Sequence, residues 1–313
     1  MPVKYISMGE FDFCANTRKG KILKDPDKKR VVENSVKKLK LSLYLAGFAY
    51  WPRNGGRERV KAQVLNWLGF DEITFVDTSV GVQALIIASN LYKYSAIVFR
   101  GTDQGDGIRD WMKNIDIGHT DFRDVYRNLS SRIPGLEYQR DFGEGHDGFT
   151  KPLVKVFDKL YQPLNKYAKQ GYKIDVIGHS KGGGEAVNMA YILQNIVGVE
   201  IREVHAHAAP RSLDELACDI ASKDLDIYRF VNPGDPVTYI PLGFNYRHVK
   251  KRMVLERRGI KNDLYDVGEF ASNIFRRLGS ALRLKFGWGV SKHYVPSYIS
   301  RVDKIYKKFD IKF

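Results

Sequence analysis

The stretch Ile174-Asp-Val-Ile-Gly-His-Ser-Lys-Gly-Gly183 decides how this chain folds. It begins with a short strand-like run, and Ala- and Met-rich, helix-forming sequence follows it as far as Gln194. Between them, Gly178-His-Ser-Lys-Gly182 fits the G-x-S-x-G turn, a sharp strand-to-helix reversal that exposes a serine hydroxyl. Glycines flank such a turn because strand and helix approach too closely for a Cβ atom. This context predicts a nucleophilic Ser180.

Strand-like and helix-like runs alternate on both sides of this turn. Short apolar runs predict strands over residues 73–77, 82–88, 96–99, 174–177, 202–207 and 227–231. Longer runs predict helices over residues 33–50, 57–68, 151–169, 183–194 and 213–221. Such alternation predicts an α/β fold with a mostly parallel central sheet and helices on both faces. Functional residues of such sheets collect at the carboxyl ends of the strands.

Size and composition indicate an ordinary globular protein. The 313 residues are 43% hydrophobic and 28% charged, which excludes a disordered or low-complexity chain. Since no repeat or long linker divides the sequence, we expect a basic N-terminal extension over residues 1–40 and one domain over residues 41–313, with a basic C-terminal helical region. Two cysteines, Cys14 and Cys218, are too few for a disulfide framework or a structural zinc site. We expect no metal and no cofactor.

The net charge of +15 is unevenly distributed. Residues 1–40 hold 11 basic and 5 acidic side chains and residues 251–313 hold 15 and 6, so the remaining 25 basic and 25 acidic side chains balance. This pattern favours peripheral contact with an anionic membrane surface, with nucleic acid a less favoured partner. A solvated, lysine-rich surface is the alternative interpretation. The oligomeric state stays open.

Targeting signals are absent from the pattern. No apolar run approaches the roughly 20 residues that span a bilayer, and the first thirty residues lack the hydrophobic stretch of a signal peptide. We therefore expect a cytoplasmic or peripheral membrane protein. Export without a signal and carriage in a virus particle are alternatives.

Five further motifs accompany the serine turn. They are Ile97-Val-Phe-Arg-Gly-Thr102, Trp111, Gly145-His-Asp-Gly-Phe149, Ala209-Pro-Arg211 and Arg229-Phe-Val-Asn-Pro-Gly-Asp-Pro-Val237. In this order the motifs resemble the class 3 (fungal-type) lipase family of α/β-hydrolases, over about residues 40–300. Lys181 departs from the family, many members of which have an aliphatic residue there. A cation at this position would lie beside the expected oxyanion site.

The resemblance implies a serine carboxyl-ester hydrolase with an α/β-hydrolase fold. Its expected substrates are lipid esters, as for a triacylglycerol lipase or a phospholipase A1, and the basic ends favour anionic phospholipid. Two alternatives remain. One is a soluble esterase or thioesterase, and the other is a catalytically inactive lipase-fold module that binds membrane or nucleic acid.

The acid of a catalytic triad is expected at Asp235. A serine needs a histidine that takes its proton and a carboxylate that orients the histidine, and in α/β-hydrolases the chain order is Ser, acid, His. Asp235 follows the strand 227–231 at its carboxyl end, where the resemblance also places the acid. Asp224 and Asp226 precede that strand and lie at the wrong end.

Two histidines follow Asp235 and are candidates for the base. His293, in His293-Tyr-Val-Pro-Ser-Tyr298, resembles the late His-plus-Tyr motif that carries the family's base. His248, in Tyr246-Arg-His248, resembles a family segment near the site that is usually not the base. We expect His293 and keep His248 as the alternative.

Two backbone amides are the expected donors to an oxyanion. Lys181 offers one because it begins the helix after the nucleophile. The resemblance implies that Thr102, in the loop after strand 96–99, offers the second. After it, residues 107–115 resemble the family's helical lid, with one apolar face formed by Ile108, Trp111, Met112 and Ile115. An ordinary amphipathic core helix is the alternative.

Three other patterns carry less weight. Residues 270–286 form a basic amphipathic pattern that suits an anionic membrane surface, or a surface helix packed on the core. His205 and His207 share one face of a strand, but with no third ligand in view they are expected to be structural. Gly143-x-Gly-x-x-Gly148 follows a segment too polar for a buried dinucleotide-binding strand.

Overall fold

Eight strands form the central sheet of this computed structural model, which describes residues 26–51, 56–102, 118–138, 140–241, 245–249, 251–256, 259–264 and 290–309. In spatial order the strands are β1 (Glu72–Asp77), β2 (Gln83–Ser89), β3 (Tyr94–Phe99), β6 (Lys173–His179), β7 (Glu203–His207), β8 (Ile227–Val231), β9 (Lys251–Glu256) and β10 (Gly259–Leu264). From β3 to β9 neighbouring strands are parallel, and β1, β2 and β10 add antiparallel edges. The sheet is therefore mostly parallel, as predicted.

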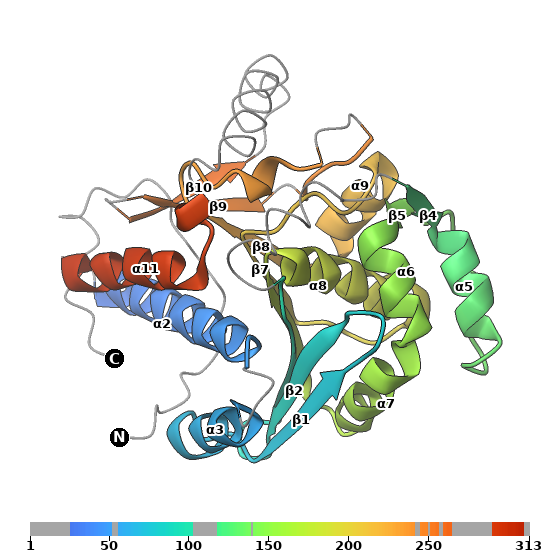
Figure 1. Ribbon diagram of the computed structural model, residues 1–313, viewed down its shortest axis with the longest axis horizontal. Coiled ribbons are helices and arrows are strands. Elements are labelled where there is room, and N and C mark those ends of the chain that lie inside the picture. Colours follow the sequence, from blue (N-terminus) through green and yellow to red (C-terminus); the bar gives the residue numbers. More distant parts are fainter. Residues whose placement is uncertain are drawn as a thin grey trace.

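Helices cover both faces of this sheet (Figure 1). One face carries α2 (Pro26–Phe48), α3 (Gly56–Ala62) and α11 (Val295–Phe309), and the other carries α6 (Asp147–Lys155), α7 (Phe157–Ala168), α8 (Lys181–Tyr191) and α9 (Glu215–Asp224). Helix α5 (Phe122–Ser130) lies at the outer end with the small two-stranded antiparallel sheet of β4 (His119–Asp121) and β5 (Glu144–His146). Short helical turns are η1 (Gln63–Trp67), η2 (Ile192–Val197), η3 (Val237–Tyr239) and η5 (Val290–Lys292).

The six predicted strands and five predicted helical regions are confirmed, with two differences in extent. The expected helix over residues 151–169 begins at Asp147, because the His146 side chain accepts the Gly148 N–H and caps its first turn. It is divided into α6 and α7 at Val156, whose φ of −113° and ψ of 14° interrupt the helical path. Helix α2 begins before residue 33, at Pro26, and crosses the boundary expected at residue 40.

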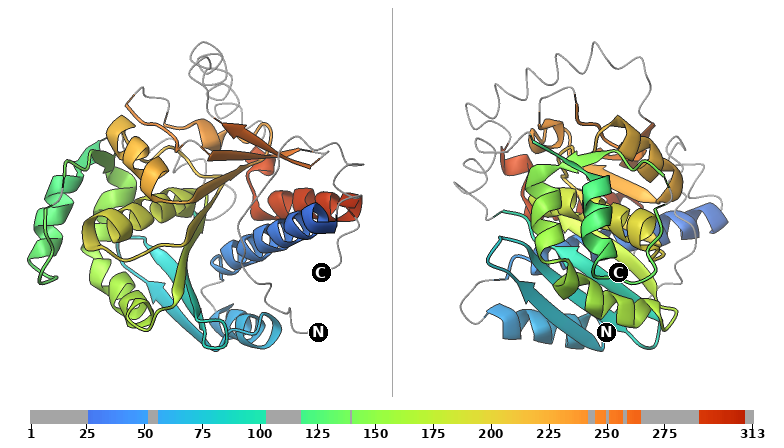
Figure 2. Two further views of the ribbon diagram at one scale, coloured as in Figure 1. Left: turned by 180° about the vertical axis from the view of Figure 1, so that it is seen from behind. Right: turned by 90° about the vertical axis from the view of Figure 1, so that its right-hand side faces the viewer.

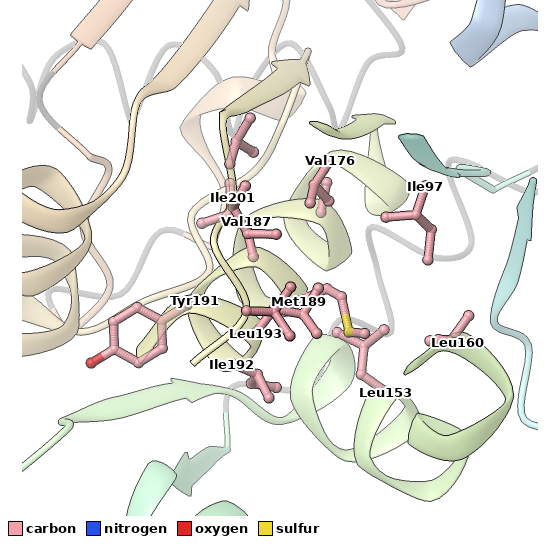
Figure 3. Packing of buried hydrophobic residues seen from close by; sticks show 14 of the residues in the cluster. Ile97, Leu153, Leu160, Val176, Val187, Met189, Tyr191, Ile192, Leu193 and Ile201 are labelled. Carbon is pink, nitrogen blue, oxygen red and sulfur yellow. The ribbon is translucent and has the colours of Figure 1, made fainter. Parts of the chain in front are cut away.

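Apolar side chains fill the space on both sides of the sheet. Helix α8 is buried from Gly182 to Tyr191 and packs against β6, β7 and α6, as Figure 3 shows around Val187 and Met189. On the opposite face α2 and α11 lie side by side (Figure 2). Leu39 of α2 and Val302 of α11 belong to one buried cluster with residues of β8 and β9. No helix within the described ranges is long and apolar enough to cross a bilayer.

Parallel pairing brings three strand ends to one edge of the sheet. Phe99 at the end of β3 is in register with Gly178 of β6, and His179 is in register with His207 of β7. His207 in turn pairs with Phe230, next to the last residue of β8. The segments that follow β3, β6 and β8 therefore leave the sheet close together.

The turn after β6 depends on two glycines. A Cβ atom on Gly178 would overlap the carbonyl group of Gly182. A Cβ atom on Gly182 would lie 2.5 Å from the Phe99 carbonyl oxygen and 2.7 Å from the Arg100 carbonyl carbon. These neighbours are backbone atoms that cannot move aside singly, so only glycine allows β3, β6 and α8 to meet.

Two histidines, His179 and His207, are fully buried, and a third, His248, is half-buried. Burial lowers the pKa of His179, of His207 and of His248 well below the ordinary value of 6.5, and neighbouring positive or titratable groups lower each further. The His207 ring stacks on Phe230 and its Nε2 atom lies 2.9 Å from Ser42 Oγ of α2. The folded protein therefore holds these imidazoles neutral.

We predict that Gly182→Ala destabilises the protein by about 2–3 kcal/mol, or prevents folding, because the new methyl group meets the Phe99 and Arg100 backbone. Gly47→Ala is the matched control, since its Cβ would have only an ordinary 3.5 Å contact with Val295 and alanine favours helix. Urea unfolding measures both. A Gly182→Ala variant as stable as Gly47→Ala would contradict the packing argument.

We predict that the free energy of unfolding falls as the pH drops below about 6.5. The unfolded chain protonates these histidines near their ordinary pKa, whereas the folded chain does not, so acid favours the unfolded state. Each histidine contributes up to about 1.4 kcal/mol per pH unit. Urea unfolding at three pH values between 7.5 and 5.5 measures the slope. His207→Gln, which keeps an amide near Ser42, should reduce that slope, and an unchanged slope would refute the explanation.

Candidate active site

Ser180 lies at the reversal between β6 and α8. Its φ of 60° and ψ of −129° are strained for a residue with a side chain. The strain is held by backbone bonds: the Ser180 N–H donates to the His207 carbonyl at 3.0 Å, and the Gly183 N–H donates to the Ser180 carbonyl at 2.8 Å. The Ser180 side chain is fully buried, and its Oγ atom has no hydrogen-bond partner among the described residues.

The segment after β3 passes directly beside this serine. A Cβ atom on Gly101 would lie 2.9 Å from Ser180 Cβ and 2.6 Å from the His179 carbonyl oxygen. The next residue, Thr102, has a buried Oγ1 atom without a partner in the described part of the chain. Lys181 is the first residue of α8, where backbone N–H groups lack intrahelical acceptors. Both expected oxyanion donors therefore flank the serine turn.

The ammonium group of Lys181 is paired and is not a free cation beside Ser180. Its ammonium group forms an ion pair with Glu185, one helical turn later, and donates to the Gly81 carbonyl at 3.1 Å. Glu185 is fully buried, and burial raises the pKa of its carboxyl group although Lys181 opposes this shift. The ion pair compensates the charge that distinguishes this turn from its aliphatic counterparts.

Asp235 lies in the loop between β8 and η3 and is fully buried. Its carboxylate accepts the Val237 N–H at 3.0 Å and the Tyr298 hydroxyl at 2.7 Å. The two carboxylate oxygens lie 3.0 and 3.1 Å from His293 Nδ1. Three groups therefore bond to this buried carboxylate, namely the Val237 N–H, the Tyr298 hydroxyl and the His293 ring.

His293 stands between η5 and α11, also fully buried. Asp235 engages its Nδ1 atom, whereas its Nε2 atom has no partner among the residues that the structure describes. The loop is fixed by Asn232, whose side-chain amide donates to the Lys292 carbonyl at 3.0 Å and whose backbone N–H donates to the Tyr298 hydroxyl at 3.0 Å. Neither Asn232 nor Tyr298 was predicted as a site residue, although Tyr298 belongs to the His-plus-Tyr motif that predicted His293.

The alternative base, His248, has a different environment. Its Nε2 atom bonds to the Thr238 carbonyl at 2.7 Å. Burial lowers its pKa, and the charges of Arg229 and Arg211 lower it further. Of the two histidines after Asp235, the structure brings His293 to the carboxylate and engages His248 elsewhere.

Two predicted segments lie outside the described residues. They are the lid candidate, with Ile108, Trp111, Met112 and Ile115, and the basic amphipathic segment 270–286. Both stay predictions.

One cluster of metal-ligating side chains lies at the other ends of the strands. Ligand atoms of Asp175, Glu203 and His205 are within 4.8 Å of one another. Arg202 forms an ion pair with Asp175, and Lys38 of α2 forms one with Glu203. Burial alone would raise the pKa of Glu203, but His205 and Lys38 lower it to about 2. Because cations already engage both carboxylates, this cluster is an internal ion-pair network that joins α2 to β7.

Residues 96–244 match the family model of class 3 lipases. No curated protein matches the chain in sequence.

Solved structures share the fold at low sequence identity. Mono- and diacylglycerol lipase from Aspergillus oryzae is 22% identical, with a TM-score of 0.56, over 74% of this chain and 86% of that one. Triacylglyceride lipase from Rhizomucor miehei is 18% identical, with a TM-score of 0.55, over 77% and 89%. A triacylglycerol lipase from Penicillium expansum is 17% identical, with a TM-score of 0.53, over 77% and 87%. Residues 96–244 are thus similar to the class 3 lipases, a family of carboxylic ester hydrolases, and the chain has the α/β-hydrolase fold that the motifs predict.

Proposed function

We propose that this chain hydrolyses lipid esters with Ser180 as nucleophile, His293 as general base and Asp235 as the orienting acid. One observation carries the proposal: Ser180 Oγ and His293 Nε2 are buried polar atoms that no described residue satisfies. A buried polar group without a partner calls for an explanation, and a catalytic role supplies one for both of these atoms. The remaining ring nitrogen of His293 is bonded to Asp235, as the base of a triad requires.

The proposed reaction proceeds through an acyl-enzyme. The Ser180 hydroxyl attacks the ester carbonyl carbon while His293 Nε2 takes its proton, and the Asp235 carboxylate stabilises the imidazolium that forms. Collapse of the tetrahedral intermediate expels the alcohol, which receives that proton from His293. Water then attacks the acyl-enzyme with the same base, releasing the fatty acid and restoring Ser180. The Thr102 and Lys181 amides are the proposed oxyanion donors, each worth roughly 3–4 kcal/mol in the transition state.

The proposed substrate within lipid esters is anionic phospholipid, as for a phospholipase A1. The support is the distribution of charge, because α2 and α11 come from the two basic ends of the sequence and pack side by side (Figure 2). Lys304 and Lys307 are exposed on α11. Positive charge on one side of the molecule would draw it to an anionic surface in a salt-dependent way. The named structural relatives act on acylglycerols, which keeps triacylglycerol as the alternative substrate.

We predict that Ser180→Ala, His293→Ala and Asp235→Asn each lower kcat/KM for a short-chain nitrophenyl ester by about 10³-fold or more. The side chains act as one unit, so the double variant Ser180→Ala/His293→Ala should lose little beyond Ser180→Ala. A fluorophosphonate probe should label the wild type at Ser180.

His248→Gln is the matched control, since glutamine can still donate to the Thr238 carbonyl. We expect its kcat/KM to stay within about threefold of the wild type. Hydrolysis that survives Ser180→Ala, or absent labelling of the wild type, would reject the catalytic assignment and favour a non-catalytic lipid- or nucleic-acid-binding module.

We further predict faster acyl release from vesicles of anionic phospholipid than from zwitterionic vesicles or triacylglycerol emulsions, with the difference reduced by salt. Rates on one ester below and above its solubility limit should show a rise at the interface. Equal rates on monomeric and aggregated ester would indicate a soluble esterase or thioesterase instead.

A further inference from the structure

A continuous series of hydrogen bonds links four parts of the site through Tyr50 and His179. Tyr50 lies just beyond the end of α2, and its hydroxyl is 2.8 Å from His179 Nδ1. His179 Nε2 is 2.8 Å from the His293 carbonyl oxygen. The Gly101 N–H bonds to the same Tyr50 hydroxyl. Neither side chain is part of the proposed triad.

The donors and acceptors along this series have one consistent direction. A backbone carbonyl can only accept, so the proton of His179 is on Nε2 and its Nδ1 atom accepts from the Tyr50 hydroxyl. The Tyr50 oxygen, having donated its proton, accepts the Gly101 N–H. This arrangement needs a neutral His179, and the burial that lowers its pKa favours that form.

Packing holds the two rings in place. The Arg100 guanidinium lies over the Tyr50 ring, 5.7 Å from its centroid. The rings of His179 and His293 are 4.9 Å apart. A Cβ atom on Gly101 would overlap the Tyr50 hydroxyl, so the oxyanion segment rests directly on that oxygen. The series therefore connects the segment before Thr102, the nucleophile turn and the loop of His293.

We propose that Tyr50 and His179 are positioning residues that set the relative placement of the oxyanion segment, Ser180 and His293. This inference rests on the proposed function and adds to it two side chains that touch no substrate. Their effect follows from geometry, because rates depend steeply on the distance between nucleophile and base and on the direction of the oxyanion donors. Loss of either bond should lower the rate of the chemical step more than the affinity for the ester.

Three conservative variants divide the series at different bonds. Tyr50→Phe removes the hydroxyl and keeps the ring under Arg100. His179→Asn can keep an acceptor near the Nδ1 position and removes the donor to His293. His179→Gln can keep a donor near the Nε2 position and removes the acceptor for Tyr50.

We expect each variant to lower kcat, and the fluorophosphonate labelling rate of Ser180, by about tenfold with KM changed less than about twofold. The double variant Tyr50→Phe/His179→Asn should lose less than the product of the single losses, because the two residues act through one series.

Tyr94→Phe is the matched control. Tyr94 is a buried tyrosine whose hydroxyl donates to Asp175 at 3.0 Å, at the opposite ends of the strands. Its loss should lower the melting temperature as much as Tyr50→Phe does, yet leave kcat and labelling unchanged. A merely structural role for Tyr50 would give both variants the same profile.

The outcomes separate this inference from the proposed function. Suppose that the wild type hydrolyses esters and is labelled by the probe, and that kcat of Tyr50→Phe and of the His179 variants stays within twofold of the wild-type value. This result would overturn the positioning role and leave the proposed function standing. The same holds if Tyr94→Phe loses as much kcat as Tyr50→Phe. A wild type that neither hydrolyses esters nor reacts with the probe would reject the proposed function and this inference with it.

Discussion

The close approach of three backbones at the serine turn is the constraint on which the rest of the structure depends. Gly178 and Gly182 leave no room for a Cβ atom, and the turn therefore rests on the backbone that ends β3. Backbone contact alone therefore places the segment after β3, including Gly101, beside Ser180. The strained φ of Ser180 persists because the surrounding sheet and α8 over-determine it.

Hydrogen bonds to buried polar groups fix the side chains around this turn. Asp235 is a buried carboxylate whose oxygens are satisfied by the Val237 amide, the Tyr298 hydroxyl and His293. The bond to Asp235 fixes the His293 ring through Nδ1 and leaves Nε2 without a partner in the described residues. Nε2 can then accept a proton, and the Ser180 hydroxyl, also without a partner there, can donate one. At the other ends of the strands, buried charges are paired with one another in the Lys38–Glu203 and Arg202–Asp175 network.

Much of this arrangement could be predicted from local patterns. The apolar runs of β2, β3 and β6 clearly predict strands. The position of Asp235 just after β8 predicted it as the acid. Strands β9 and β10 were not predicted, because their sequences mix charged and apolar residues without a sustained pattern. Chain order left His248 and His293 equal, and only the resemblance separated them. Tyr50 meets His179 across 129 positions, a contact that no local periodicity encodes.

The complete burial of the proposed triad has a kinetic consequence. Ser180, Asp235 and His293 have no solvent-accessible surface, so in this conformation neither bulk water nor an acyl chain can reach them. Turnover by this triad would therefore begin with a rearrangement that uncovers the Ser180 hydroxyl, and the free-energy cost of that rearrangement would enter every apparent rate constant. An apolar phase that stabilises the uncovered conformation would lower this free-energy cost. It would accelerate the enzyme without altering any bond made or broken at the ester.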